Sequence, residues 1–114
     1  MKKHLSEPWF SLVATGKKTY EGRLGTNRDF SEAPVGTVVT WHNDDLGFER
    51  TVRVKITGKS RYPSFAAMIR DKGVDKVLPT VPASKGSDVY RQFYPDDRVK
   101  QAGVLCIRMK PLQS

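Results

Sequence analysis

The residues of this chain best suited to chemistry stand close together near its amino end. Lys18, Glu21 and Arg23 belong to the string Gly16-Lys17-Lys18-Thr19-Tyr20-Glu21-Gly22-Arg23. In an extended strand, Glu21 and Arg23 lie on one face, and Lys18 enters from the turn before it. Opposite charges this close keep each other ionised, which lowers the pKa of the glutamate. The trio therefore predicts a polar pocket floor, in which Arg23 offers a planar donor fork and Glu21 accepts from an amine.

The same string is superficially like a phosphate-binding loop, but its spacing is different. Such a loop needs a glycine five residues before its Gly-Lys pair and a serine or threonine directly after the lysine. Ser11 and Lys18 occupy those positions, and a helix is predicted where a strand should precede the motif. We therefore exclude a nucleoside triphosphatase. The structural alternative for the trio is a surface ion pair, which stabilises a fold very little.

Aromatic side chains can add stacking to this charged site, because single-stranded or flipped bases are held by both. Trp9 lies on the apolar stripe of a predicted helix and Trp41 on the inner face of a predicted strand, so both are expected in the core. Tyr62, Tyr90 and Tyr94 are the candidates expected to lean over a cleft.

The sequence gives little support for a metal site or for a reactive cysteine. His42 stands before Asn43, Asp44 and Asp45, but no second histidine or cysteine is at ligand spacing, so no metal and no cofactor is expected. Cys106 is expected to be a buried, inert thiol. A single cysteine cannot form an internal disulfide, which suits a reducing compartment.

The charge balance favours polyanionic partners. Twenty Lys and Arg against twelve Asp and Glu give a formal charge of +8 in 114 residues, and such a surface binds nucleic acid by releasing counterions. The series Arg53, Lys55, Lys59 and Arg61 is a solvated face that can extend an anion path toward the pocket.

A membrane is not an expected partner. The candidate helices carry mixed charge, no apolar segment is long enough to span a bilayer, and Ser6, Glu7 and Pro8 interrupt the first apolar stretch before a signal peptide could form. We therefore expect a cytoplasmic, intracellular protein.

Short elements must position these residues. Pro8, Ser64, and Ser87 or Asp88 mark the starts of three predicted helices. The predicted strands are 19–24, 37–42, 48–59 and 104–109, with 27–36 as a surface loop and 43–47 as a hairpin connection. We expect one α+β domain over residues 1–114, with about five strands and about three short helices in a partly open barrel that protects its strand edges.

The motif resembles a known family signature. Gly16-x-Lys18-x-x-Glu21-x-Arg23, preceded by Leu5-x-x-x-Trp9-Phe10, is similar to the signature of the ASCH domain, a relative of the PUA fold. The similarity continues through Val35-Gly36, Tyr62-x-Ser64-Phe65, Val77-Leu78-Pro79, Tyr90-x-x-Phe93-Tyr94 and Gly103-Val104, and so covers nearly the whole chain. The resemblance implies a PUA-like barrel with a cleft beside the motif, which in the family binds RNA or other nucleic acid and sometimes hydrolyses a substrate.

The leading hypothesis is a module that binds RNA, another single-stranded nucleic acid, a nucleotide or a modified nucleoside. Its expected ligand-binding residues are Lys18, Glu21, Arg23, Tyr62, Ser64, Tyr90 and Tyr94. Because Lys18 stands at a turn beside a polar strand face, its replacement is expected to abolish function with little loss of stability.

Three other functions stay open. Some small ASCH proteins are amidohydrolases of acylated cytidine that use a lysine, a threonine three residues on and a distant glutamate; here Glu21 takes the place of the threonine. Lys18 and Glu21 would then be the catalytic pair, provided that the site lowers the pKa of the lysine. A ribonuclease would combine Lys18 with Tyr62 or Ser64. A protein-interaction module with a vestigial cleft is the last alternative.

Overall fold

The structure is a computed structural model that describes residues 1–112 of the chain. These residues form five β-strands, six mostly short α-helices and one 3₁₀ turn. The strands are β1 (Lys2–His4), β2 (Tyr20–Leu24), β3 (Val38–Asn43), β4 (Arg50–Tyr62) and β5 (Val104–Pro111). The helices are α1 (Trp9–Ala14), α2 (Arg28–Glu32), α3 (Phe65–Lys72), α4 (Val74–Val77), α5 (Gly86–Arg91) and α6 (Asp96–Ala102), and the 3₁₀ turn η1 is Ala83–Lys85.

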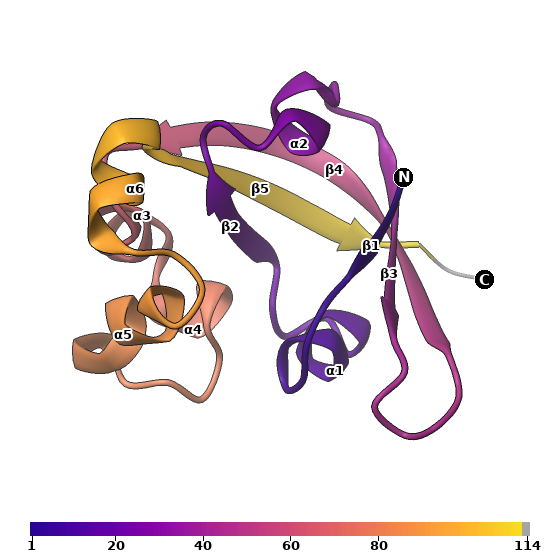
Figure 1. Ribbon diagram of the computed structural model, residues 1–114. Coiled ribbons are helices and arrows are strands. Elements are labelled where there is room, and N and C mark those ends of the chain that lie inside the picture. Colours follow the sequence, from indigo (N-terminus) through magenta and orange to yellow (C-terminus); the bar gives the residue numbers. More distant parts are fainter. Residues whose placement is uncertain (113–114) are drawn as a thin grey trace.

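One mixed sheet holds all five strands in the order β1-β3-β4-β5-β2. Only the β1–β3 pair is parallel among these strands, and the other pairs are antiparallel. The long strands β4 and β5 curve, and the sheet wraps into a half-barrel (Figure 1). This is the partly open, PUA-like α+β architecture that the sequence predicts.

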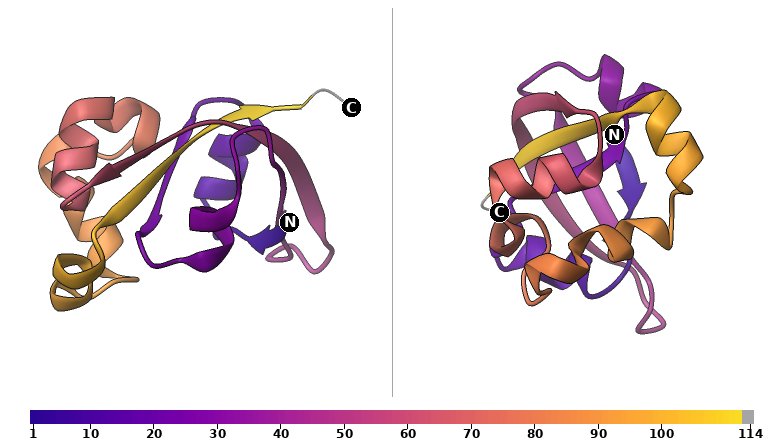
Figure 2. Two further views of the ribbon diagram at one scale, coloured as in Figure 1. Left: turned by 90° about the horizontal axis from the view of Figure 1, so that it is seen from above. Right: turned by 90° about the vertical axis from the view of Figure 1, so that its left-hand side faces the viewer.

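Two hydrophobic clusters occupy the two faces of the sheet. The inner cluster includes Trp41, Ile56 and Ile107, and the outer cluster includes Met68 and Cys106. Helices α3 to α6 gather at one end of the half-barrel, away from the β3–β4 hairpin (Figure 2). The expected burial of Trp41 and Cys106 is confirmed, because their exposed fractions are 0% and 1%.

Several elements differ from the predictions. The predicted loop 27–36 contains α2, because the side chain of Asn27 accepts a hydrogen bond from the Phe30 amide at 3.2 Å and Phe30 is fully buried. The sequence locates four of the five expected strands, and β1 is the one that it does not locate. Helices α4 and α6 are not predicted either. The count of about three helices is therefore wrong.

The helix starts agree in part with the predicted caps. Ser64 caps α3 as expected, accepting a hydrogen bond from the Ala67 amide at 3.1 Å. Ser87 and Asp88 do not cap α5, which already begins at Gly86. A side chain at Gly86 would meet Ile69, so this helix begins where its backbone lies close to α3.

No helix within residues 1–112 combines the length and the apolar character needed to cross a membrane. The cytoplasmic location stays a prediction.

Candidate functional site

A cavity of about 280 Å³ opens beside the predicted motif on β2. Its walls come from the segment after β1, from α1, from β2 and from α5 with the residues that follow it. The lining residues are His4, Leu5, Ser6, Trp9, Lys18, Glu21, Gly22, Arg23, Leu78, Val89, Tyr90, Phe93 and Tyr94. Lys18, Glu21, Arg23, Tyr90 and Tyr94 therefore meet at one cavity.

Lys18 is the most unusual residue of the site, because its side chain is only 1% exposed. Its ammonium donates a hydrogen bond to the carbonyl of Val77, lies 3.6 Å from a Glu21 carboxylate oxygen and stands 5.5 Å from the centre of the Trp9 ring. Burial lowers the pKa of Lys18, and the charge of Glu21 opposes this only in part. The turn that the sequence predicts as exposed thus directs its lysine inward.

Glu21 joins the two cations of the site. One carboxylate oxygen accepts from the Gly22 amide at 2.9 Å, and the other accepts from the Arg23 guanidinium at 3.3 Å. Burial raises the pKa of Glu21, but the charges of Lys18 and Arg23 and these hydrogen bonds outweigh it, so the net pKa lies below its ordinary value. Glu21 is therefore ionised at neutral pH.

Arg23 lies between charged and aromatic groups. Its guanidinium carbon stands 5.2 Å from the centre of the Trp41 ring and 5.5 Å from that of Phe30, both within cation–π range. Its side chain is 19% exposed, against 7% for Glu21. Of the three charged side chains, Arg23 is thus the one most open to a ligand.

Tyr90 and Tyr94 stand opposite this charged group. Phe65 stacks on Tyr90, with ring centres 4.0 Å apart and an angle of 7°, and on Tyr94 at 5.6 Å. The hydroxyl of Tyr90 is buried and finds no hydrogen-bond partner among residues 1–112. Burial, with the nearby Glu21 charge, raises the pKa of Tyr90 well above its ordinary value. The cavity wall therefore contains a neutral, buried hydroxyl whose capacity to donate a hydrogen bond is not used by the described residues.

Tyr62 and Ser64 do not line this cavity. The Tyr62 hydroxyl donates to Asp71 on α3, and the Ser64 hydroxyl is used as a helix cap. Both residues therefore have structural partners on the α3 side of the sheet.

Sequence reasoning missed several members of the wall. Trp9 was expected in the core, but it is partly buried, contacts both hydrophobic clusters and also lines the cavity. Phe93, which is 53% exposed, belongs to the motif Tyr90-x-x-Phe93-Tyr94 but is not among the candidate site residues predicted from the sequence. An exposed aromatic beside Tyr94 is a signal that could have identified it.

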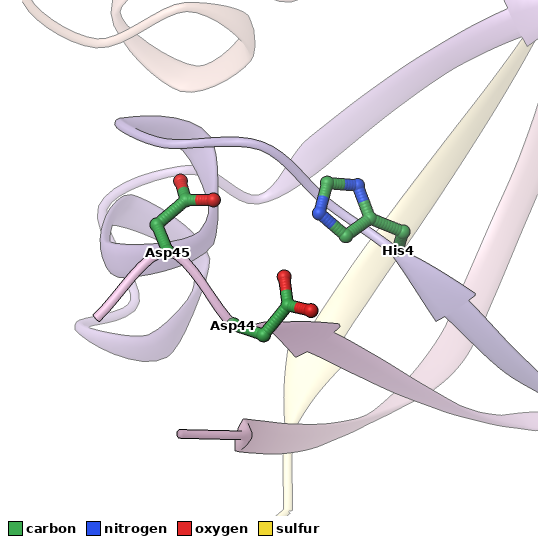
Figure 3. Close-up of side chains that lie close together, drawn as sticks. All are labelled: His4, Asp44 and Asp45. Carbon is green, nitrogen blue, oxygen red and sulfur yellow. The ribbon is translucent and has the colours of Figure 1, made fainter. Parts of the chain in front are cut away.

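A group of possible ligand atoms lies at the ends of β1 and β3, and one of its residues, His4, also lines the cavity. The side chains of His4, Asp44 and Asp45 converge there (Figure 3), with one ligand atom from each within 4.8 Å of the others. All three residues are exposed, and exposed groups of this kind are common without an ion. His4 was not considered in the sequence, which drew attention to His42 instead.

The arrangement suits binding of a planar polar ligand. Aromatic rings provide faces for stacking, Arg23 provides unused donors, and the Tyr90 hydroxyl is a buried donor without a partner among the described residues. The buried Lys18–Glu21 pair neutralises itself and fixes the position of Arg23. Such a site can read the edge of a heterocycle, whereas its lysine is not free to hold a phosphate.

Comparisons with known proteins agree with the fold and the motif. The ASCH domain matches residues 4–113. Among solved structures, the crystal structure of hypothetical protein PH0355 is 32% identical, covers 97% of both chains and gives a TM-score of 0.84. The solution NMR structure of protein PF0455 from Pyrococcus furiosus is 29% identical, covers 99% of this chain and 97% of that chain, and gives a TM-score of 0.78.

The comparison with curated proteins found no match. The family match nevertheless covers nearly the entire chain, including Lys18, Glu21 and Arg23. This chain belongs to the ASCH domain family.

Proposed function

We propose that this domain binds the base of one nucleotide in the Lys18 cavity, either as a free nucleoside or nucleotide or within single-stranded RNA. The observation that carries the proposal is the unpaired, buried hydroxyl of Tyr90 in the same wall as Glu21 and Arg23. A buried polar group without a partner costs about 1–3 kcal/mol. A ligand that accepts from Tyr90 recovers this free energy on binding.

The size of the cavity supports one base rather than a longer segment. At about 280 Å³ it lies just below the roughly 300–1,000 Å³ of pockets for drug-sized ligands. Phe93 and Tyr94 at the wall offer aromatic faces, and stacking of a base on such a face contributes about 1–3 kcal/mol. The formal charge of +8 supports attraction of the attached phosphates.

The polar groups favour recognition of a base edge. Glu21 is ionised and accepts hydrogen bonds, Arg23 donates one, and the unpaired Tyr90 hydroxyl is neutral and can donate another. A base carries donors and acceptors side by side on its edge, which matches this mixture. A phosphate offers acceptors alone, so it can accept from Arg23 but cannot donate a hydrogen bond to Glu21.

Hydrolysis of a nucleoside amide is the second candidate, because burial lowers the pKa of Lys18 toward the range of a proton-transfer group. The position of its ammonium favours binding over this alternative, since the group is 1% exposed and already donates to Val77. Tyr62 and Ser64 lie outside the cavity, so the ribonuclease alternative has no geometric support.

One experiment tests both candidates. The protein is titrated by calorimetry with the four ribonucleosides, their monophosphates, acylated cytidines and short single-stranded RNAs, and each mixture is then analysed by mass spectrometry for product. We expect saturable binding of at least one nucleoside without turnover. Formation of deacylated cytidine would favour the hydrolase. No binding of any nucleoside or monophosphate, together with RNA binding that Arg23→Ala leaves unchanged, would contradict the base-in-cavity proposal.

A further inference from the structure

The outer face of the sheet carries a row of basic side chains that the cavity does not use. Arg53 and Lys55 lie on β4, and Arg108 and Lys110 lie on β5. All four are exposed, whereas the residues that alternate with them, such as Val54 and Met109, are buried inside the half-barrel. Helices α3 to α6 cover only the other end of this face, near Val104 and Cys106.

The charges in this row are poorly compensated. Lys55 lies directly opposite Lys110 in the antiparallel β4–β5 pair. Like charges opposite each other destabilise a sheet. None of the four basic residues forms an ion pair with any acidic residue within 1–112. The face therefore concentrates positive charge at a cost to stability, which an anionic partner would remove.

A small pocket of about 200 Å³ lies at the point where this row meets the end of α3. Its lining residues are Tyr20, Gly58, Lys59, Ser60, Lys72 and Arg108. The Arg108 guanidinium donates to the Thr57 hydroxyl at 3.0 Å and to the Thr57 carbonyl at 3.3 Å, which fixes it across the irregularity in β4. Its remaining donors are open to a ligand.

Lys72 faces Arg108 from the other side of the pocket. Its ammonium lies 5.2 Å from the centre of the Tyr20 ring. Its ion pair with Asp71 is long, at 4.0 Å, and the Asp71 carboxylate also accepts from the Tyr62 hydroxyl. The pocket thus combines a fixed guanidinium, an ammonium and the hydroxyl of Ser60, with Asp71 outside its lining.

We propose that this outer face binds the phosphate backbone of single-stranded nucleic acid, with one phosphate in the Arg108–Lys72 pocket and the next ones along Lys55 and Lys110. Charge complementarity identifies the partner, since a row of exposed cations fits a polymer of evenly spaced phosphates. The site is distinct from the cavity because Tyr20 and Glu21 follow each other on β2 and therefore point to opposite faces. Binding at this outer face does not require that the cavity hold a base.

The test measures the salt dependence of binding to a labelled single-stranded RNA of about 12 nucleotides by fluorescence anisotropy, between about 50 and 200 mM salt. Each phosphate contact contributes about 0.7 to the slope of log affinity against log salt. We expect the double variant Lys72→Gln/Arg108→Gln, which removes the one phosphate contact of the pocket, to lose about 0.7 of this slope. The variant Lys55→Gln/Lys110→Gln, which removes two phosphate contacts, should lose about 1.4. The charge-preserving variant Lys72→Arg/Arg108→Lys should retain the slope.

Lys85→Gln/Lys100→Gln provides the matched control, since it removes the same charge from exposed residues on the helical side. An equal loss of slope in this control, or an unchanged slope in the outer-face variants, would overturn the inference. Circular dichroism verifies folding of every variant. Nucleoside binding should stay unchanged in the outer-face variants, so failure of this inference is distinguishable from failure of the proposed cavity function.

Discussion

The ammonium of Lys18 and the carboxylate of Glu21 lie 3.6 Å apart with almost no exposure to solvent. In water such a pair contributes little, but inside a protein the removal of one partner leaves an uncompensated charge, which costs about 3–5 kcal/mol. The pair therefore stabilises the fold as well as lining the cavity.

The first prediction concerns stability. Lys18→Ala should lower the free energy of unfolding by about 3 kcal/mol or more, because Glu21 loses a partner and the Val77 carbonyl loses a donor. Urea denaturation followed by circular dichroism measures this change in the free energy of unfolding. This result would replace the expectation from sequence that the substitution leaves stability nearly unchanged.

The neighbouring lysine supplies a control for that measurement. Lys17 is exposed, so Lys17→Ala should change stability by no more than about 0.5 kcal/mol. The double variant Lys18→Met/Glu21→Gln should recover part of the loss, since it removes both buried charges. Equal stability of Lys17→Ala and Lys18→Ala would mean that Lys18 is not buried in solution.

The second prediction is a pH dependence. The pKa of Glu21 lies below its ordinary value of 4.5 in the fold, so its carboxylate stabilises the protein above that value and loses this contribution as the pH falls toward the folded pKa. Wild type should therefore exceed Glu21→Gln in stability at neutral pH, and the difference should shrink below about pH 4.5. Urea unfolding at a series of pH values measures this difference.

Glu32→Gln serves as the control for the pH series. Its carboxylate is 67% exposed and its ion pair with Arg28 lies on the surface. A pair of this kind contributes about 0–1 kcal/mol. A difference between wild type and Glu21→Gln that does not change with pH would show that the carboxylate has no such role.

The third prediction tests the contact between Gly25, which follows β2, and Ala102 at the end of α6. A side chain at Gly25 would collide with the backbone carbonyl of Ala102 and would stand 3.0 Å from the Arg61 guanidinium. Gly25→Ala should destabilise the fold by about 1–3 kcal/mol, because a backbone atom cannot move aside easily. Gly58→Ala is the matched control, since its nearest neighbour would be 3.6 Å away. An equal decrease of the melting temperature in Gly25→Ala and Gly58→Ala would contradict this packing.

The sequence predicted those features that depend on local patterns. Alternation along β2 placed Glu21 and Arg23 on one face, and the structure puts both on the cavity. Ser64 was identified as a helix cap from its type and position alone. These outcomes require only neighbouring residues, whose spacing is fixed by the geometry of strands and helices.

The features that were missed depend on distant parts of the chain. Lys18 is buried because the carbonyl of Val77, 59 residues away, accepts from it. Helix α6 buries only Val99, so its sequence carries no apolar period, and β1 forms three residues of pairing with β3. Tyr62 was grouped with the site by its type, but its hydroxyl is directed to Asp71 instead. No local pattern encodes these contacts.

The last prediction concerns the Tyr90 hydroxyl. Tyr90→Phe removes a buried group that has no partner within residues 1–112, so the free energy of unfolding should stay equal or rise slightly. Affinity for a nucleoside should fall by about five- to tenfold, which is the net value of one hydrogen bond of about 1–1.5 kcal/mol. Calorimetric titration measures the affinity, and urea denaturation measures the stability.

Tyr20→Phe makes the same chemical change outside the cavity and should leave nucleoside affinity intact. The two readouts separate a ligand-binding role of Tyr90 from a structural one. A hydroxyl that binds ligand lowers affinity without lowering stability when it is removed. A clear loss of stability in Tyr90→Phe would reveal a hydrogen-bond partner of the hydroxyl within the folded protein. Unchanged nucleoside affinity would exclude the hydroxyl from ligand recognition, because the hydroxyl would then affect only the stability of the fold, through the free-energy cost of its burial.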